Sequence, residues 1–174
     1  MNRRRVRTHT MNRVASVACI VWMVGCGGSS PTTPSTPSVP DYQGQWTGDF
    51  TVSSCTGTGT FAGPPAFCTA FQSGTVLPMR LTLSVVGTQV SGSGTFGSVS
   101  IPVSGVIGND GRLLLSGSGG VVVQNLSVTL TLMNWSTIAS GTSMTGSWST
   151  SWTTTQGSGS ASTGQTIRTL TKTG

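Results

Sequence analysis

The sequence predicts an all-β fold: an eight-stranded antiparallel up-and-down barrel that occupies residues 41–174. Three observations favour it. Apolar residues alternate with Ser and Thr in many short segments, which is the period-2 pattern of a strand with one buried face. Gly-rich turns separate the segments, and no helical periodicity is sustained. Because the links are mostly short, neighbouring strands should pair as hairpins, and closing the sheet removes its exposed edges.

Eight segments carry the strand pattern. We expect strands at residues 44–54, 79–87, 89–96, 99–107, 112–118, 124–135, 143–154 and 159–172. In the first of them Trp46, Phe50 and Val52 share one face, and Thr47 lies on the other. The sequence GNDG at residues 108–111 is a strong hairpin signal, since Asn, Asp and Gly tolerate positive φ.

Tryptophan and methionine gather in the last third of the chain. Met144, Trp148 and Trp152 should point inward from one strand, and Trp135 ends the strand before it. An eight-stranded barrel can hold one ligand in its mouth. We therefore predict that a small apolar ligand contacts a wall formed by Trp135, Met144, Trp148 and Trp152, with Phe50 and Phe96. The alternative is that these side chains simply fill the barrel.

Two further alternatives concern the sheet and its outer face. Pro102 falls within a predicted strand and Pro78 at the start of another, whereas proline is tolerated only at edges or bulges. An open β-sandwich is therefore the alternative fold.

If the tryptophans face outward, they would be stacking platforms, and the domain would be a non-enzymatic module for an envelope surface or a glycan.

The start of the first strand carries Gly44-x-Trp46. This pair resembles the G-x-W signature of lipocalin-like and avidin-like barrels. The resemblance implies that Trp46 closes the floor of the barrel and that a basic residue on the last strand packs across it. By position, Arg168 is the candidate for that partner. The second lipocalin motif, T-D-Y, is absent from the sequence.

The N-terminal 25 residues have the composition of an export signal. Five arginines and no acid lie in residues 1–13, and residues 14–25 are apolar or small. The segment ends in Met23-Val24-Gly25-Cys26, which resembles the lipobox of bacterial lipoproteins. The resemblance implies cleavage before Cys26 and attachment of fatty acyl chains such as palmitate to that residue. The alternative is a free cysteine in an ordinary signal.

Residues 26–40 are predicted to be a tether. After Cys26 the sequence GGSSPTTPSTPSVP contains four prolines among Gly, Ser and Thr, a composition that favours extended, semi-rigid chain. Two or three acyl chains hold a protein firmly on a membrane. Gly27 rather than Asp follows the cysteine, and by the sorting pattern of enterobacterial lipoproteins the resemblance implies an outer-membrane address in the bacterial cell envelope.

Removal of the signal leaves Cys55 and Cys68 as the two cysteines without a lipid. An exported protein meets an oxidising compartment, so we predict a disulfide between them. The bridge would close a loop of about 14 residues and contribute roughly 3 kcal/mol.

The charged residues exclude several functions. From Cys26 onward four basic residues stand against three acidic ones, so no basic patch is available for nucleic acid. The chain's one histidine, His9, lies in the signal, and this argues against a Ser-His-Asp site and a metal centre. Asp41 borders the tether and Asp110 belongs to a turn, so paired catalytic carboxylates are not expected. We predict no enzyme activity, cofactor or metal.

Overall fold

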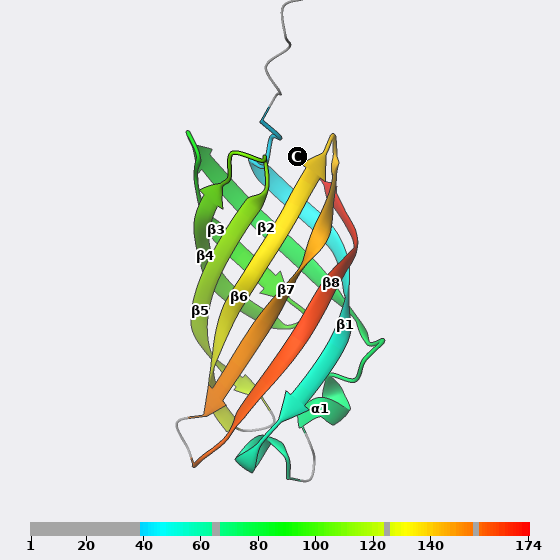
Figure 1. The fold of residues 1–174 in the computed structure, drawn as a ribbon, viewed down its shortest axis with the longest axis vertical. Helices are drawn as coiled ribbons and strands as arrows, with labels where there is room; N and C mark the ends of the chain where they lie inside the picture. The colour runs from blue at the N-terminus through cyan, green and yellow to red at the C-terminus, as the bar shows by residue number, and fades with distance from the viewer. Residues whose placement is uncertain (1–38, 64–66, 124–125, 155–156) are drawn as a thin grey trace, which may run out of the picture. The chain divides into compact units, whose positions relative to one another are not determined.

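The structure is a computed structural model that describes residues 39–63, 67–123, 126–154 and 157–174. Residues 44–172 form a closed barrel of eight antiparallel strands in chain order, which confirms the predicted fold class (Figure 1). The predicted signal (1–25), Cys26 and most of the tether lie outside the described residues. No helix in the described part of the chain is long and apolar enough to cross a membrane.

The strands match the predicted segments closely. In chain order they are β1 (Gly44–Gly57), β2 (Val76–Val86), β3 (Gln89–Phe96), β4 (Val99–Ile107), β5 (Leu113–Val123), β6 (Leu126–Ser140), β7 (Ser143–Thr154) and β8 (Ser160–Lys172). Two short helical turns, η1 (Gly59–Phe61) and α1 (Phe67–Ala70), lie between β1 and β2. The main differences are at two strand ends. Strand β5 runs past the predicted end at residue 118, where Gly119 and Gly120 still pair with β6, and β6 runs past the predicted end at residue 135 to Ser140.

Pairing between the first and last strands closes the sheet. Strand β1 pairs with β2 on one side and with β8 on the other, from Trp46 opposite Lys172 to Gly57 opposite Ala161. The open sandwich is therefore wrong. All other pairs join consecutive strands, as an up-and-down barrel requires.

Each proline is paired with one neighbouring strand and lies beyond the ladder to the other. The β2–β3 register begins at Met79, so Pro78 lies just beyond it, and its carbonyl accepts a hydrogen bond from Gly97 N at 2.8 Å. The β4–β5 register covers only Ser104–Ile107, so Pro102 lies where β4 is not paired with β5. A closed barrel thus accommodates proline where one ladder ends. The two prolines, which favoured the sandwich as the alternative fold, are therefore compatible with the barrel.

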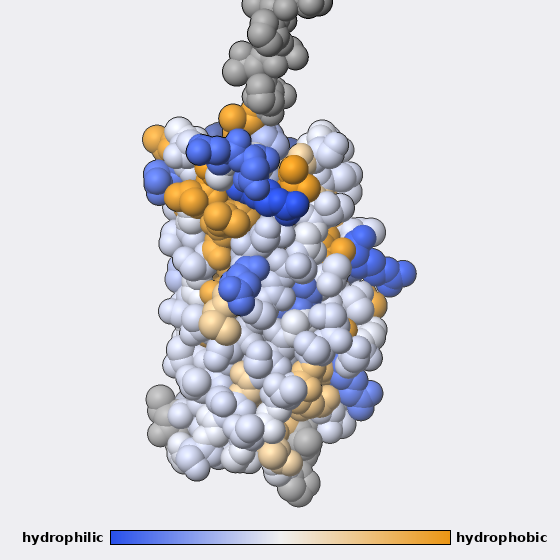
Figure 2. All heavy atoms as spheres, in the orientation of Figure 1, coloured by the Kyte–Doolittle hydropathy of each residue, from blue (hydrophilic) through white to orange (hydrophobic). Residues whose placement is uncertain are grey.

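Alternation divides each strand between the core and solvent. On β6, Val128, Leu130 and Leu132 are buried, and on β7 Met144, Trp148 and Trp152 are buried. The outward positions are mostly Ser and Thr, so much of the face in Figure 2 has near-neutral hydropathy. The inward positions supply the apolar area that stabilises the barrel.

Trp46 closes one end of the barrel. The indole is fully buried, and its Nε1 donates a hydrogen bond to the carbonyl of Tyr42 at 2.9 Å. Tyr42 is also fully buried, and its hydroxyl donates to the carbonyl of Gly111 at 2.8 Å and accepts from Ala139 N at 3.1 Å. This end of the barrel is filled by side chains and tied to the β4–β5 turn and to the end of β6.

The basic residue over Trp46 is Lys172, and the expectation for Arg168 was wrong. The Lys172 Nζ lies 5.8 Å from the centre of the indole ring and 2.6 Å from Asp41 Oδ2. The β1–β8 register shifts between Asp49 and Phe50, and Arg168 falls at that irregularity with its side chain exposed. A bulge of this kind changes which face a residue occupies, and the sequence motif does not reveal it.

Candidate functional site

An apolar pocket lies at the other end of the barrel, away from Trp46. Its volume is about 240 Å³. The rim comes from α1 and the residue after it, the start of β2 and the β3–β4 turn, where Ala70 and Ser98 are exposed. The deeper wall comes from β1, β6, β7 and β8, whose lining side chains are buried. The site is therefore a recess that reaches from the mouth of the barrel into its core.

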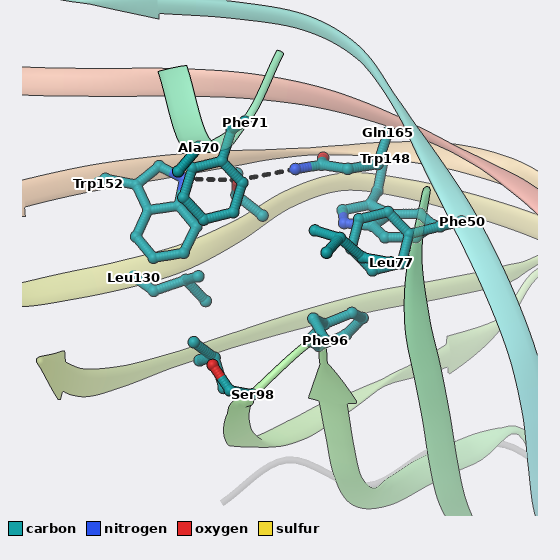
Figure 3. A pocket seen from close by; sticks show the side chains of 13 residues that line it. Phe50, Ala70, Phe71, Leu77, Phe96, Ser98, Leu130, Trp148, Trp152 and Gln165 are labelled. Atoms are coloured by element: carbon teal, nitrogen blue, oxygen red, sulfur yellow. Dashed lines mark hydrogen bonds between the residues drawn. The ribbon is translucent and has the colours of Figure 1, made fainter. Parts of the chain in front are cut away.

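Aromatic rings form most of the wall. Figure 3 shows them in two groups, Trp148 with Phe50 and Trp152 with Phe71. The ring centres of Phe50 and Trp148 are 5.2 Å apart, and those of Phe96 and Trp148 are 5.7 Å apart. Such tilted contacts are favourable, and they hold the rings in fixed positions. The pocket is thus bounded by rigid, flat surfaces.

Trp135 supports this wall from behind. It stacks on Trp148 with ring centres 4.6 Å apart and an interplanar angle of 28°. Its Nε1 donates to Thr137 Oγ1 at 2.9 Å, so the buried N–H is satisfied. Trp135 does not line the pocket itself. Its role is to fix the position of Trp148.

The segment that follows β1 covers one side of the mouth. Helix α1 places Phe67 against Trp152, with ring centres 5.1 Å apart, and Phe71 stacks on Phe67 at 4.6 Å. The disulfide between Cys55 and Cys68, which the sequence predicted, joins α1 to β1. A four-residue helix has little stability of its own. The bridge and the two phenylalanines therefore hold this cover in place.

A small polar cluster lies within the apolar wall. Thr150 on β7 and Thr163 and Gln165 on β8 are buried, and the two threonine hydroxyls hydrogen-bond each other. Trp152 Nε1 donates to Thr150 Oγ1 at 2.9 Å and to Thr163 Oγ1 at 3.3 Å. Gln165 Nε2 donates to Thr150 Oγ1 at 3.1 Å and also to Thr163 Oγ1. This cluster is the buried polar feature of a largely apolar site.

Gln165 has one group that the protein does not satisfy. Its side chain lines the pocket, the residue is 5 % exposed, and its Oε1 has no hydrogen-bond partner among the residues that the structure describes. Buried polar groups are nearly always hydrogen-bonded, so an exception beside a pocket requires an explanation.

The structure places only some of the residues of the predicted ligand wall at the pocket. Trp148 and Trp152 line the pocket, as do Phe50 and Phe96. Trp135 lies behind the wall, and Met144 is buried near the Trp46 end, because its neighbour Ser143 pairs with Thr171 of β8. Alternation places Met144 on the inner face but does not give its height along the barrel.

The sequence analysis missed the polar cluster and the cover. Thr150 stands between Trp148 and Trp152 in the inward phase of β7, and Gln165 occupies an inward position between Thr163 and Ile167. A polar residue at an inward position of an apolar strand face was the available signal. The residues of the cover show no alternation, so no pattern in the sequence indicated that Phe71 reaches the barrel.

The pocket carries no charged side chain among its lining residues. No group of three or more His, Cys, Asp or Glu gathers anywhere in the described ranges. The site can therefore exclude water, stack on a flat ligand and exchange hydrogen bonds with it. Comparison with known proteins found no matching family model, no matching curated protein and no matching solved structure.

Proposed function

We propose that this protein is a lipid-anchored, non-enzymatic binder of a small apolar molecule in the bacterial cell envelope. The observation that carries the proposal is the aromatic pocket at one end of a barrel whose other end is filled by Trp46 and Tyr42. A barrel with a plugged floor and a hollow mouth has the architecture of a ligand container, in the way that the G-x-W resemblance implies.

The size of the pocket limits the ligand. An engineered apolar cavity of about 150 Å³ holds benzene, which has six non-hydrogen atoms. By proportion, the pocket of about 240 Å³ suits a molecule of roughly ten non-hydrogen atoms. Drug-sized ligands occupy pockets of about 300 to 1,000 Å³. The ligand class is therefore a compact, flat, apolar molecule of one or two rings.

The lipid anchor rests on the sequence at Cys26. The arginine-rich segment, the apolar run and the Met23–Cys26 motif together support lipidation. The described chain enters the barrel beside Trp46, at the end away from the pocket.

Mass spectrometry tests the anchor. The protein extracted from membranes should begin at Cys26 and carry acyl chains, whereas Cys26→Ala should leave the precursor without lipid. An unmodified Cys26 in membrane-extracted protein would overturn this part of the proposal.

Ligand titration tests the pocket. Naphthalene should quench or shift the emission of Trp148 and Trp152 in the full chain carrying Cys26→Ser, which lacks the acyl-acceptor thiol. Leu77→Trp fills the half-buried rim and should weaken binding at least tenfold. Val85→Trp is the matched control, since Val85 lies on the same face of β2 outside the pocket and should leave the affinity unchanged. Equal affinities in the wild type and in Leu77→Trp would refute a ligand site here.

A glycan module that stacks sugars on outward-facing tryptophans has less support. The four tryptophans among the described residues are at most 4 % exposed. They cannot act as external platforms without opening the barrel.

A further inference from the structure

The hydrogen-bond count around Gln165 is unbalanced. The donors are the indole N–H of Trp152, the amide NH₂ of Gln165 and the hydroxyls of Thr150 and Thr163. The NH₂ group bonds to the threonine oxygens, so Gln165 Oε1 is left over. Trp152 and the two threonines also hydrogen-bond one another, so the cluster holds together without using both ends of the carboxamide.

The position of Gln165 is fixed from two sides. It pairs with Val52 of β1 and with Trp148 of β7, so its backbone lies in the wall of the closed sheet. The side chain lies among the lining residues, close to the Thr150 hydroxyl (Figure 3). The last torsion of a glutamine side chain has a broad energy profile, so the carboxamide can turn toward the pocket when a ligand replaces its hydrogen bonds to the two threonines. A ligand in the pocket is therefore within reach of the unused end.

Stability alone does not account for a glutamine at this position. An apolar side chain of similar length would fill the same place without leaving a buried polar atom unpartnered, which is unfavourable. The neighbouring inward residue Ile167 shows that β8 tolerates such side chains. A buried carboxamide beside an aromatic pocket is the kind of polar group that orients a ligand.

We propose that the ligand carries a hydroxyl group, which hydrogen-bonds to the carboxamide of Gln165 while the ring system packs on Phe50, Trp148 and Trp152. This inference rests on the proposed ligand-binding function and specifies its ligand as a flat aromatic or alicyclic alcohol. A hydroxyl both donates and accepts, so it matches the carbonyl of the amide and, after a turn about the last torsion, its NH₂.

Two probes of equal size test the proposal. The full chain carrying Cys26→Ser is titrated with 2-naphthol and 2-methylnaphthalene, and the ratio of their dissociation constants is measured in the parent and in Gln165→Met. Each ligand loses the same hydration on binding either variant, so this cost cancels when the two ratios are compared. The change in the ratio therefore reports the contact with Gln165. One net hydrogen bond predicts that the preference for 2-naphthol falls about two- to tenfold in Gln165→Met. Gln89→Met, at an exposed position on β3, should leave the ratio unchanged.

A second measurement uses the chain without a change at Gln165. The side-chain NH₂ resonances of Gln165 should shift with 2-naphthol and move much less with 2-methylnaphthalene. The hydroxyl proposal is overturned if both ligands bind but the ratio of their dissociation constants is the same in the parent and in Gln165→Met, and the Gln165 resonances shift equally with both ligands. In that case the ligand-binding function still stands. If neither ligand binds the parent chain, the proposed function fails and this inference fails with it.

Discussion

Replacement of Trp46 by alanine should be among the most costly single changes in the barrel. The side chain is fully buried, and Trp→Ala in a core typically costs about 3 to 5 kcal/mol. The change also leaves the Tyr42 carbonyl without its donor and removes the ring beneath Lys172. A buried acceptor without a partner adds about 1 kcal/mol or more. We expect a loss near the upper end of the range, against a typical total stability of about 5 to 15 kcal/mol.

Urea unfolding followed by circular dichroism measures this loss. Trp46→Phe separates the packing cost from the loss of the hydrogen bond, because it keeps an aromatic ring but has no Nε1. We expect it to cost about 1 to 2 kcal/mol. Ser84→Ala, at an exposed position of β2, should change stability by no more than about 0.5 kcal/mol. The reasoning is refuted if Trp46→Ala costs about the same as Ser84→Ala, since the indole would then not be the floor of the barrel.

Three further predictions follow from described contacts. Replacing Cys55 and Cys68 together by serine opens a covalent loop with a sequence separation of 13 and should cost about 3 kcal/mol in urea unfolding; thiol labelling of the unfolded, unreduced parent should find neither thiol free. Burial raises the pKa of Tyr42, the chain's one tyrosine, above 10.0, so the unfolded phenol ionises first and stability should fall as pH rises past about 10; a Tyr42→Phe variant with an equally steep loss would contradict this. The hydrogen bond from Lys172 lowers the pKa of Asp41 below 3.8, so the pair stabilises the fold above that pH, and this stabilisation is lost as pH falls through the folded pKa. Lys172→Met should cost at most about 1 kcal/mol of stability at pH 7 and should reduce the loss of stability on acidification.

Alternation predicted the strands because it reflects a simple physical constraint. In a barrel one face of every strand is buried, and Trp148 and Trp152 lie on that face of β7 as predicted. Turn residues such as those at 108–111 gave the connections, and short links gave the order of the strands. The pattern failed at Gly119 and Gly120, which carry no side chain to reveal a face although they lie in β5.

Height along the barrel was not predictable in the same way. Met144 and Trp152 share the inner face of β7, yet only Trp152 lines the pocket. Which end a residue occupies depends on the stagger between strands, and irregularities such as that between Ser143 and Ser147 change it. Arg168 was misplaced by the same kind of irregularity.

The two ends of the barrel differ in how closely their side chains pack. At the floor, Trp46 and Tyr42 are fully buried, and their polar atoms bond to the backbone, so this end gains the full benefit of close packing. At the mouth, space is left among the rings, and the lining side chains forgo the contacts that a filled core would give. The disulfide is placed at this under-packed end, where it fixes Phe67 and Phe71 through a covalent bond to β1. A barrel that only needed to fold would fill this space with larger apolar side chains instead of a buried glutamine and a bridge. The ligand that we propose would supply the missing contacts.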